Sequence, residues 1–159
     1  MYNTLFVSEN LIKGSHTEDT WIGIEKNTNL IELIDYKEHY EEKGKNIFEQ
    51  YILDIIDKKN IDLIIFALGS SLVIDIYFLK KINEDTHCKI ITMFPDSEHL
   101  FEYNDRYYAQ TSDLTCVLGP SAENMFKLYG INTVWTQGFD ENRYCKIDTS
   151  PCFDVSFVG

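Results

Sequence analysis

Short apolar runs recur along the chain, and longer stretches of mixed polar and apolar residues separate them. The runs are rich in Ile, Leu, Val and Phe, and residues 61–68 are apolar at almost every position. Such runs are typical of strands that are buried on both faces of a parallel sheet. We expect the strands at residues 4–7, 30–36, 61–68, 89–94, 114–118 and 131–136.

The stretches between the runs have the spacing of helices. The clearest of these stretches has apolar residues at three- and four-residue steps between Ile47 and Ile56, and charged residues on the opposite side. A first helix is expected to begin at Thr17 as its N-cap, because the acidic residues that follow suit the positive end of a helix dipole. Further helices are expected up to about residue 83, over residues 98–110 and over residues 121–129.

Strands that alternate with helices at this spacing imply right-handed parallel crossovers. The predicted fold is therefore α/β, a Rossmann-like doubly wound parallel sheet. A chain of 159 residues is near the common size of one domain. The hydrophobic fraction of 44% is ordinary for a globular protein, so we expect a packed core.

Charge narrows the class of partner. The 14 Lys and Arg residues against 26 Asp and Glu residues leave a net charge of −12, which repels a phosphate backbone. We therefore expect no nucleic-acid partner, and an anionic membrane surface is disfavoured for the same reason. The N-terminus lacks a basic leader, and the longest apolar run, residues 63–68, is too short to cross a bilayer, so we expect no transmembrane segment and a cytoplasmic protein.

Several familiar sites are absent from the sequence. It contains no G-x-G-x-x-G fingerprint, no P-loop and no nucleophile elbow, and only Glu9 partly fits the acids of a receiver domain. The four cysteines, Cys88, Cys116, Cys145 and Cys152, show no metal-binding spacing and are expected to be reduced, buried thiols. We expect no metal and no cofactor.

Ligands of open parallel sheets bind outside the carboxyl ends of the strands. The candidates that follow the predicted strands are Ser15, His16, Gly69, Ser70, Asp96, Ser97, Glu98, His99, Gly119, Ser121 and Gly138. Gly, Ser and Asp also end strands and cap helices, so about half of these positions are explained by capping alone. The densest ionisable cluster is residues 96–99, where a carboxylate or imidazole would act as a general base or orient sugar hydroxyls.

The end of the sequence differs from the rest. Residues 140–151 are polar and irregular, as expected of a connector, and residues 153–159 form another apolar run that ends in glycine. This run fits the opening strand of a second Rossmann unit. The alternative is a strand that pairs at the edge of the first sheet.

From about residue 61 onward the chain resembles GT-B glycosyltransferases of the group that includes the spore maturation CgeB-like proteins. The matching stretches are IDLIIFALG at 61–69, FPDS at 94–97, DLTCVL at 113–118, VWTQGFD at 134–140 and FDVSFVG at 153–159. The resemblance implies that residues 1–144 are the N-terminal, acceptor-side domain. Residues 145–159 are then an interdomain connector and the first strand of a truncated C-terminal domain.

The resemblance also implies a function. The enzyme would transfer a sugar from a nucleotide-sugar donor to an unidentified acceptor, in glycan or surface polysaccharide synthesis, without a metal held by a D-x-D motif. Asp96 and His16 are the catalytic candidates, and the remaining positions given above would contact the acceptor. The donor would be held beyond Gly159, so residues 1–159 alone are expected to be inactive.

Two other classes of function remain open. The first is a non-catalytic, flavodoxin-like module that binds a small ligand or a protein at the same strand ends. The second is an assembly domain, for which the group Tyr103, Tyr107 and Tyr108 is the only indication in the sequence.

Overall fold

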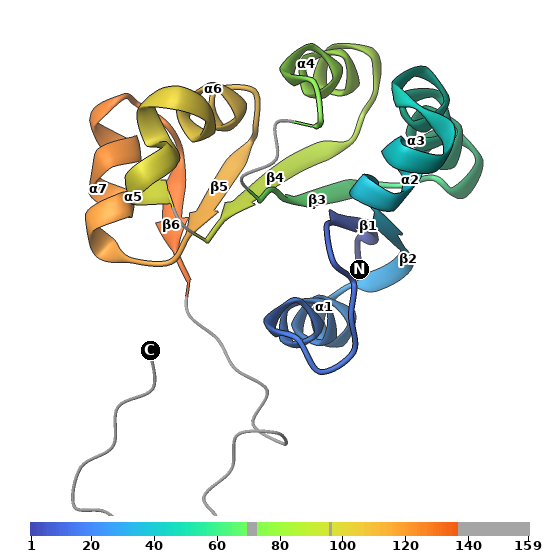
Figure 1. Ribbon diagram of the computed structural model, residues 1–159, viewed down its shortest axis with the longest axis horizontal. Helices are drawn as coiled ribbons and strands as arrows, with labels where there is room; N and C mark the ends of the chain where they lie inside the picture. Colours follow the sequence, from blue (N-terminus) through green and yellow to red (C-terminus); the bar gives the residue numbers. More distant parts are fainter. Residues whose placement is uncertain (70–72, 96, 137–159) are drawn as a thin grey trace, which may run out of the picture.

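The computed structural model describes residues 1–69, 73–95 and 97–136, and its strands lie in one sheet (Figure 1). The six strands are all parallel and follow the order β2-β1-β3-β4-β5-β6. The strands are β1 (Asn3–Ser8), β2 (Asn29–Asp35), β3 (Leu63–Ala67), β4 (Lys89–Phe94), β5 (Leu114–Val117) and β6 (Thr133–Trp135). The predicted α/β fold with a doubly wound parallel sheet is confirmed.

Helical segments connect each strand to the next. They are α1 (His16–Asn27), α2 (Tyr36–Lys43), α3 (Lys45–Lys59), α4 (Ile76–Asp85), α5 (Ser97–Leu100), the π-helical turn η1 (Phe101–Asp105), α6 (Arg106–Ala109) and α7 (Pro120–Leu128). Of these, α1 alone lies against one face of the sheet, and the others cover the opposite face (Figure 1). This asymmetry follows from right-handed crossovers, because β2 lies on one side of β1 and the later strands on the other.

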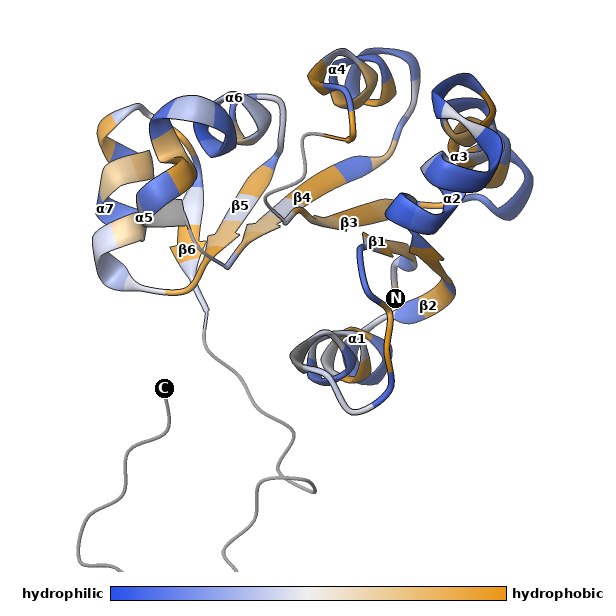
Figure 2. Cartoon of the chain, viewed as in Figure 1, coloured by the Kyte–Doolittle hydropathy of each residue, from blue (hydrophilic) through white to orange (hydrophobic). Residues whose placement is uncertain are grey.

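Two hydrophobic cores result. The larger fills the space between the sheet and the many-helix layer, with Phe48, Phe66 and Phe126 fully buried in it. The smaller lies under α1, where Phe6, Leu63 and Ile65 are packed by the helix. Apolar positions are concentrated in the central strands β3 and β4, whereas the helices mix apolar with hydrophilic positions (Figure 2).

The first helix begins earlier than predicted. Its N-cap is Ser15, whose side chain accepts a hydrogen bond from the backbone N–H of Glu18, so the prediction of Thr17 as N-cap is wrong. Gly14 has a φ of +87°, which lets the chain turn two residues earlier, and its N–H donates to the Glu18 carboxylate at 2.6 Å. The result resembles a capping box, and Thr17 becomes a buried residue of the first turn.

The segment between β4 and β5 is helical, as predicted, but it is not a regular α-helix. The backbone N–H of Arg106 donates to the carbonyl of Phe101, five residues back, which makes η1 a π turn. A π turn adds one residue to a helical turn. The consecutive residues Asn104 and Asp105 are consequently both buried, with exposed fractions of 6% and 2%.

None of the helices within the described ranges is long and apolar enough to cross a membrane. The predicted connector, the apolar run 153–159 and the proposed domain boundary at residues 144 and 145 lie outside the described residues.

Candidate functional site

The strand order defines one switch point in the sheet. The connection from β1 passes through α1 to β2 on one side, whereas β3 lies on the other side of β1 and is followed by α4 on the opposite face. Crossovers diverge where the order reverses, and ligands of open α/β sheets bind in the crevice this leaves at the carboxyl ends of the strands. The neighbourhood of β1 and β3 is therefore the first place to look for a ligand site.

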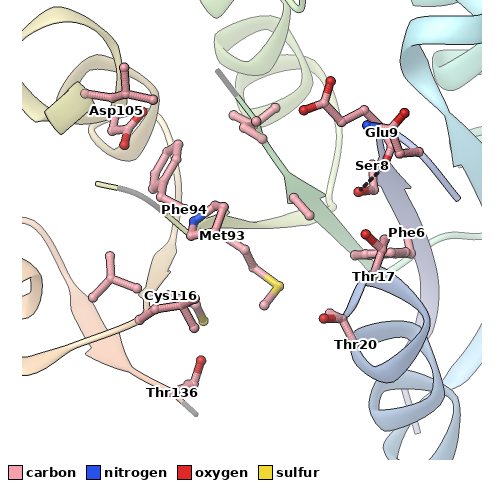
Figure 3. A pocket seen from close by; sticks show the side chains of 18 residues that line it. Phe6, Ser8, Glu9, Thr17, Thr20, Met93, Phe94, Asp105, Cys116 and Thr136 are labelled. Carbon is pink, nitrogen blue, oxygen red and sulfur yellow. Dashed lines mark hydrogen bonds between the residues drawn. The ribbon is translucent and has the colours of Figure 1, made fainter. Parts of the chain in front are cut away.

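A cleft of about 310 Å³ opens at that place (Figure 3). Its lining comes from the carboxyl ends of β1, β3, β4, β5 and β6, from the first turns of α1 and from the segment around η1. The described residues that line it are Phe6, Ser8, Glu9, Asn10, Thr17, Thr20, Ala67, Leu68, Gly69, Met93, Phe94, Pro95, Leu100, Asp105, Cys116, Val117, Leu118 and Thr136.

Met93 lies in the middle of this cleft. Its thioether extends from β4 between Cys116 on one side and Thr17 and Thr20 of α1 on the other (Figure 3). Met93 and Cys116 are half-buried and lie on the sheet face that α1 covers only in part. The cleft therefore has an apolar, polarisable floor with hydroxyl groups on one wall.

Glu9 follows β1 directly and lies against the carboxyl end of β3. A Cβ atom placed on Gly69 would be 1.7 Å from the Glu9 Oε1 atom, so the Glu9 carboxylate occupies the space that a side chain at residue 69 would need. The backbone N–H of Gly69 donates to the hydroxyl of the buried Tyr36 at 3.4 Å, and the Ser8 hydroxyl donates to the Glu9 carbonyl at 3.2 Å. Glycine at residue 69 thus permits the close approach of the Glu9 carboxylate to the strand end.

Asp105 lines the cleft from the side opposite Glu9 (Figure 3). It is 2% exposed, and its Oδ1 atom accepts a hydrogen bond from the Asn104 amide at 3.2 Å. The surroundings of η1 are poorly hydrated: burial, with smaller contributions from Asp75, Tyr36 and Asp105, raises the pKa of Tyr108 to about 12. The Tyr108 hydroxyl stays protonated and donates to the carbonyl of Ile74.

The two cysteines in the described ranges are free thiols, as predicted, but only Cys88 is buried and Cys116 is half-buried. Cys88 is buried and donates to the Ile61 carbonyl at 2.6 Å, and burial raises its pKa. Burial also raises the pKa of Cys116, which keeps the thiol at the cleft floor protonated and a weak nucleophile. Cys145 and Cys152 lie outside the described residues.

The structure brings one described candidate, Gly69, to the cleft. Ser15 caps α1 and donates to the Ile12 carbonyl, so it has a structural role. Gly119 is the N-cap residue of α7, and Ser121 is exposed in the first turn of that helix. His99 is exposed and is not a lining residue.

Several predicted residues cannot be compared with the cleft. Ser70, Asp96 and Gly138 lie outside the described residues, and so do the side chains of His16, Ser97 and Glu98. Their assignment as catalytic or acceptor-binding residues stays a prediction.

Sequence reasoning missed the two carboxylates. Glu9 is the second residue after a predicted strand, as Asp96 is, although its sequence context fits only part of a receiver-type pattern. Asp105 lies four residues after Phe101 and three before Tyr108, so an acid on the apolar stripe of a predicted helix was the available signal.

Within the part of the chain that the structure describes, no group of three or more His, Cys, Asp or Glu side chains is placed to hold a metal ion. No family model, curated protein or solved structure matches this chain.

Proposed function

We propose that the chain supplies the acceptor-side domain of a GT-B glycosyltransferase, in which the cleft holds the acceptor and a second domain holds the nucleotide-sugar donor. The observation that carries the proposal is the cleft at the carboxyl edge of the parallel sheet, with Glu9 and Asp105 on opposite sides. Carboxylates accept hydrogen bonds from sugar hydroxyls and repel donor phosphates. The ordered motifs that resemble CgeB-like enzymes give further support.

The proposed reaction forms a bond between an acceptor hydroxyl oxygen and the anomeric carbon of the donor sugar. The bond from that carbon to the phosphate oxygen breaks, and the nucleoside diphosphate leaves with the electron pair. The acceptor proton passes to a carboxylate that acts as general base. We propose Asp96 as this base because it follows β4 in the sequence, with His16 as the second candidate.

Glu9 and Asp105 have a different role in this proposal. Both line the cleft, and both orient acceptor hydroxyls by accepting hydrogen bonds from them. The other proposed acceptor contacts are Gly69, at the cleft, and the polar residues that follow β4. In the proposal, residues 1–159 alone bind the acceptor without transferring sugar to it, and the reaction takes place in the cytoplasm.

The test uses the full product of the gene that encodes residues 1–159. Release of nucleoside diphosphate is measured with a panel of nucleotide sugars and sugar acceptors. Asp96→Asn is expected to lower kcat by about 100-fold, which is the usual contribution of a general base. Glu9→Gln is expected chiefly to raise the acceptor KM, because it removes a binding contact.

The matched control is Glu25→Gln, which changes the same charge on an exposed part of α1 that is not in the cleft lining. It is expected to leave kcat and KM unchanged. Absence of turnover with every nucleotide sugar would reject the transferase, and full turnover by Asp96→Asn would reject Asp96 as the base.

One observation favours a second candidate function. The first five strands have the order β2-β1-β3-β4-β5, which is the order of flavodoxin-like folds, and these bind their ligand at the same switch point. As a binding module, residues 1–159 would bind a ligand with the same affinity as the full gene product. Turnover in the full gene product would contradict this candidate.

A further inference from the structure

The cleft has an unusual charge for a site that serves a nucleotide-dependent enzyme. Its described lining contains the carboxylates of Glu9 and Asp105 and no Lys, Arg or His side chain. The other polar lining groups are hydroxyls and one amide, from Ser8, Thr17, Thr20, Thr136 and Asn10. Phosphate and carboxylate ligands are usually held by Arg or Lys, so the lining does not suit an anion.

The helix end at the cleft does not compensate for this lack of cations. The N-terminus of a helix attracts anions through its free N–H groups. At α1, however, the Glu18 N–H donates to the Ser15 side chain, and the Glu18 carboxylate itself accepts from Gly14. Glu18 and Asp19 place two acids in the first turn, so an anion at this helix end meets further negative charge.

The geometry points to a ligand of the opposite charge. We propose that the cleft binds an amine-bearing polyhydroxylated compound, of which an amino sugar is the simplest form, in preference to neutral or acidic sugars. The ammonium group lies against the Glu9 carboxylate, hydroxyls donate to Asp105, and the apolar face of the ring covers Met93. This inference rests on the proposed function, because it takes the cleft to be the acceptor site.

Glu9 is the residue that determines this preference, and Gly69 positions it. The Glu9 Oε1 atom is 1.7 Å from where a Cβ on Gly69 would lie, and its Cδ atom is 2.7 Å from that point. Alanine at residue 69 therefore displaces the end of the Glu9 side chain while its charge is kept. The φ of Gly69 is not in the left-handed region, so alanine there causes no backbone strain.

The test compares three sugars that share a ring and differ in charge: glucosamine, glucose and glucuronate. Each is titrated into ¹⁵N-labelled protein of residues 1–159 at mildly acidic pH, and Kd is obtained from amide shifts at the cleft. Glucosamine is expected to bind about fivefold more tightly than glucose, and glucuronate more weakly than glucose, as one partly exposed charge pair allows. Equal affinities, tighter binding of glucuronate or no binding of any of the three would overturn the proposal.

Variants separate the local carboxylate from the overall negative charge. Glu9→Gln and Gly69→Ala are each expected to reduce the advantage of glucosamine over glucose to less than about twofold. The control Glu25→Gln removes the same charge outside the cleft and is expected to keep the full advantage. If the control loses the advantage as much as Glu9→Gln does, net charge alone explains the preference and the proposal fails.

The outcome is distinguishable from failure of the transferase. If glucosamine binds most tightly and glucuronate most weakly, but the full gene product transfers no sugar, the proposed reaction is rejected and the proposed ligand class is kept. Turnover with neutral or acidic acceptors in preference to amino sugars would reject the proposed ligand class and keep the proposed reaction.

Discussion

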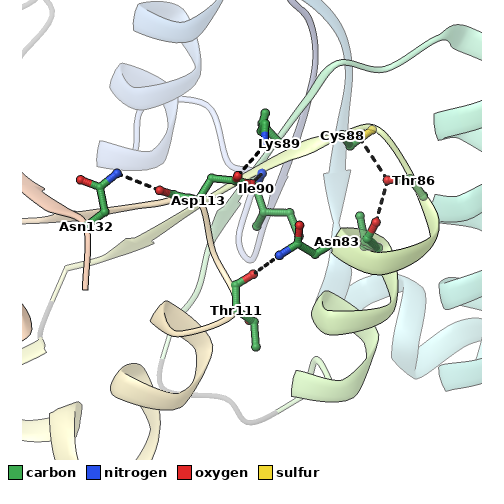
Figure 4. A network of polar contacts seen from close by, with 9 residues as sticks. Asn83, Thr86, Cys88, Lys89, Ile90, Thr111, Asp113 and Asn132 are labelled. Carbon is green, nitrogen blue, oxygen red and sulfur yellow. Dashed lines mark hydrogen bonds and ion pairs between the residues drawn. The ribbon is translucent and has the colours of Figure 1, made fainter. Parts of the chain in front are cut away.

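The two edges of the sheet use carboxylates in different ways. At the amino edge, Asp62 and Asp113 each accept a hydrogen bond from a backbone N–H of a neighbouring strand, at 2.9 and 2.8 Å. Asp113 also binds the Lys89 ammonium at 2.8 Å, and its carbonyl accepts from Asn132 (Figure 4). At the carboxyl edge, Glu9 and Asp105 line a cleft whose described residues include no cation.

The difference indicates what each acid does. Burial by itself raises the pKa of Asp113, but the hydrogen bonds from Lys89 and Ile90 and the Lys89 charge outweigh it, and the pKa is lowered. Asp113 is thus a structural acid that joins β4 to β5. Glu9 and Asp105 instead line a cleft, so we expect substitution at the carboxyl edge to change ligand binding more than stability, and substitution at the amino edge to do the opposite.

The largest expected effect is at the amino edge. Asp113→Ala leaves the Ile90 N–H and the Lys89 ammonium without their acceptor, and it should lower the free energy of unfolding by about 2 kcal/mol. Urea denaturation followed by circular dichroism measures this. Asp57→Ala, on the exposed side of α3, is the control and should change the value by less than about 0.5 kcal/mol. Equal effects of the two substitutions would show that the Asp113 contacts do not stabilise the sheet.

The stability from Asp113 should depend on pH. Its folded pKa is below the unfolded value of about 3.9, so the contribution is fully present above that value and is lost as pH falls through the folded pKa. The free energy of unfolding of Asp113→Asn should therefore be about 1 kcal/mol below that of the parent at neutral pH. Urea titrations at a series of pH values should find this gap narrowing below about pH 4, and a gap that widens there would contradict the assignment.

Ser15→Ala should separate capping from ligand binding. Loss of the hydroxyl that accepts from Glu18 is expected to lower the free energy of unfolding by about 1 kcal/mol. The Kd for glucosamine should stay within about twofold of the parent value, since Ser15 is not among the cleft residues. A large loss of affinity with unchanged stability would make Ser15 a ligand contact, as the sequence predicted.

The smallest effect on stability is expected at the carboxyl edge. Glu9→Gln should change the free energy of unfolding by less than about 0.5 kcal/mol, because the amide occupies the same space. Gly69→Ala should destabilise the parent more than it destabilises Glu9→Ala, in which no carboxylate meets the new Cβ. Additive effects in this double-mutant cycle would show that Glu9 does not lie over Gly69.

The fold was predictable because its signals are local and repeated. The apolar runs predict strands that are buried on both faces, and the stretches between them have the spacing of helices. A parallel sheet could therefore be predicted without any sequence motif. The N-cap at Ser15 was missed because the turn at Gly14 lets the helix start from a residue two positions before Thr17. That turn depends on the φ of a single residue, which composition and spacing do not reveal.

The site was predictable only in part. The rule that ligands bind at strand ends selected the edge of the sheet where the cleft lies and Gly69 in its lining, but it also selected Ser15, which caps a helix. Asp105 reaches the cleft through the π turn at Phe101, and a hydrogen bond that spans five residues has no simple sequence pattern. Glu9 matters because a distant glycine leaves it space, which is a tertiary relation.

The most direct test of the contrast between the edges is the melting temperature of three proteins with and without saturating glucosamine: the parent, Glu9→Gln and Asp113→Asn. A ligand that binds the folded state at about 100 times its Kd stabilises it by about 2.7 kcal/mol, which raises the melting temperature by several degrees. We predict that Asp113→Asn melts lower but keeps the full ligand-induced rise, and that Glu9→Gln melts like the parent but loses about a third of the rise at the same glucosamine concentration, as an affinity about fivefold weaker requires. A full rise in Glu9→Gln, or a rise lost in Asp113→Asn, would contradict the assignment of ligand binding to the carboxyl edge and of stability to the amino edge.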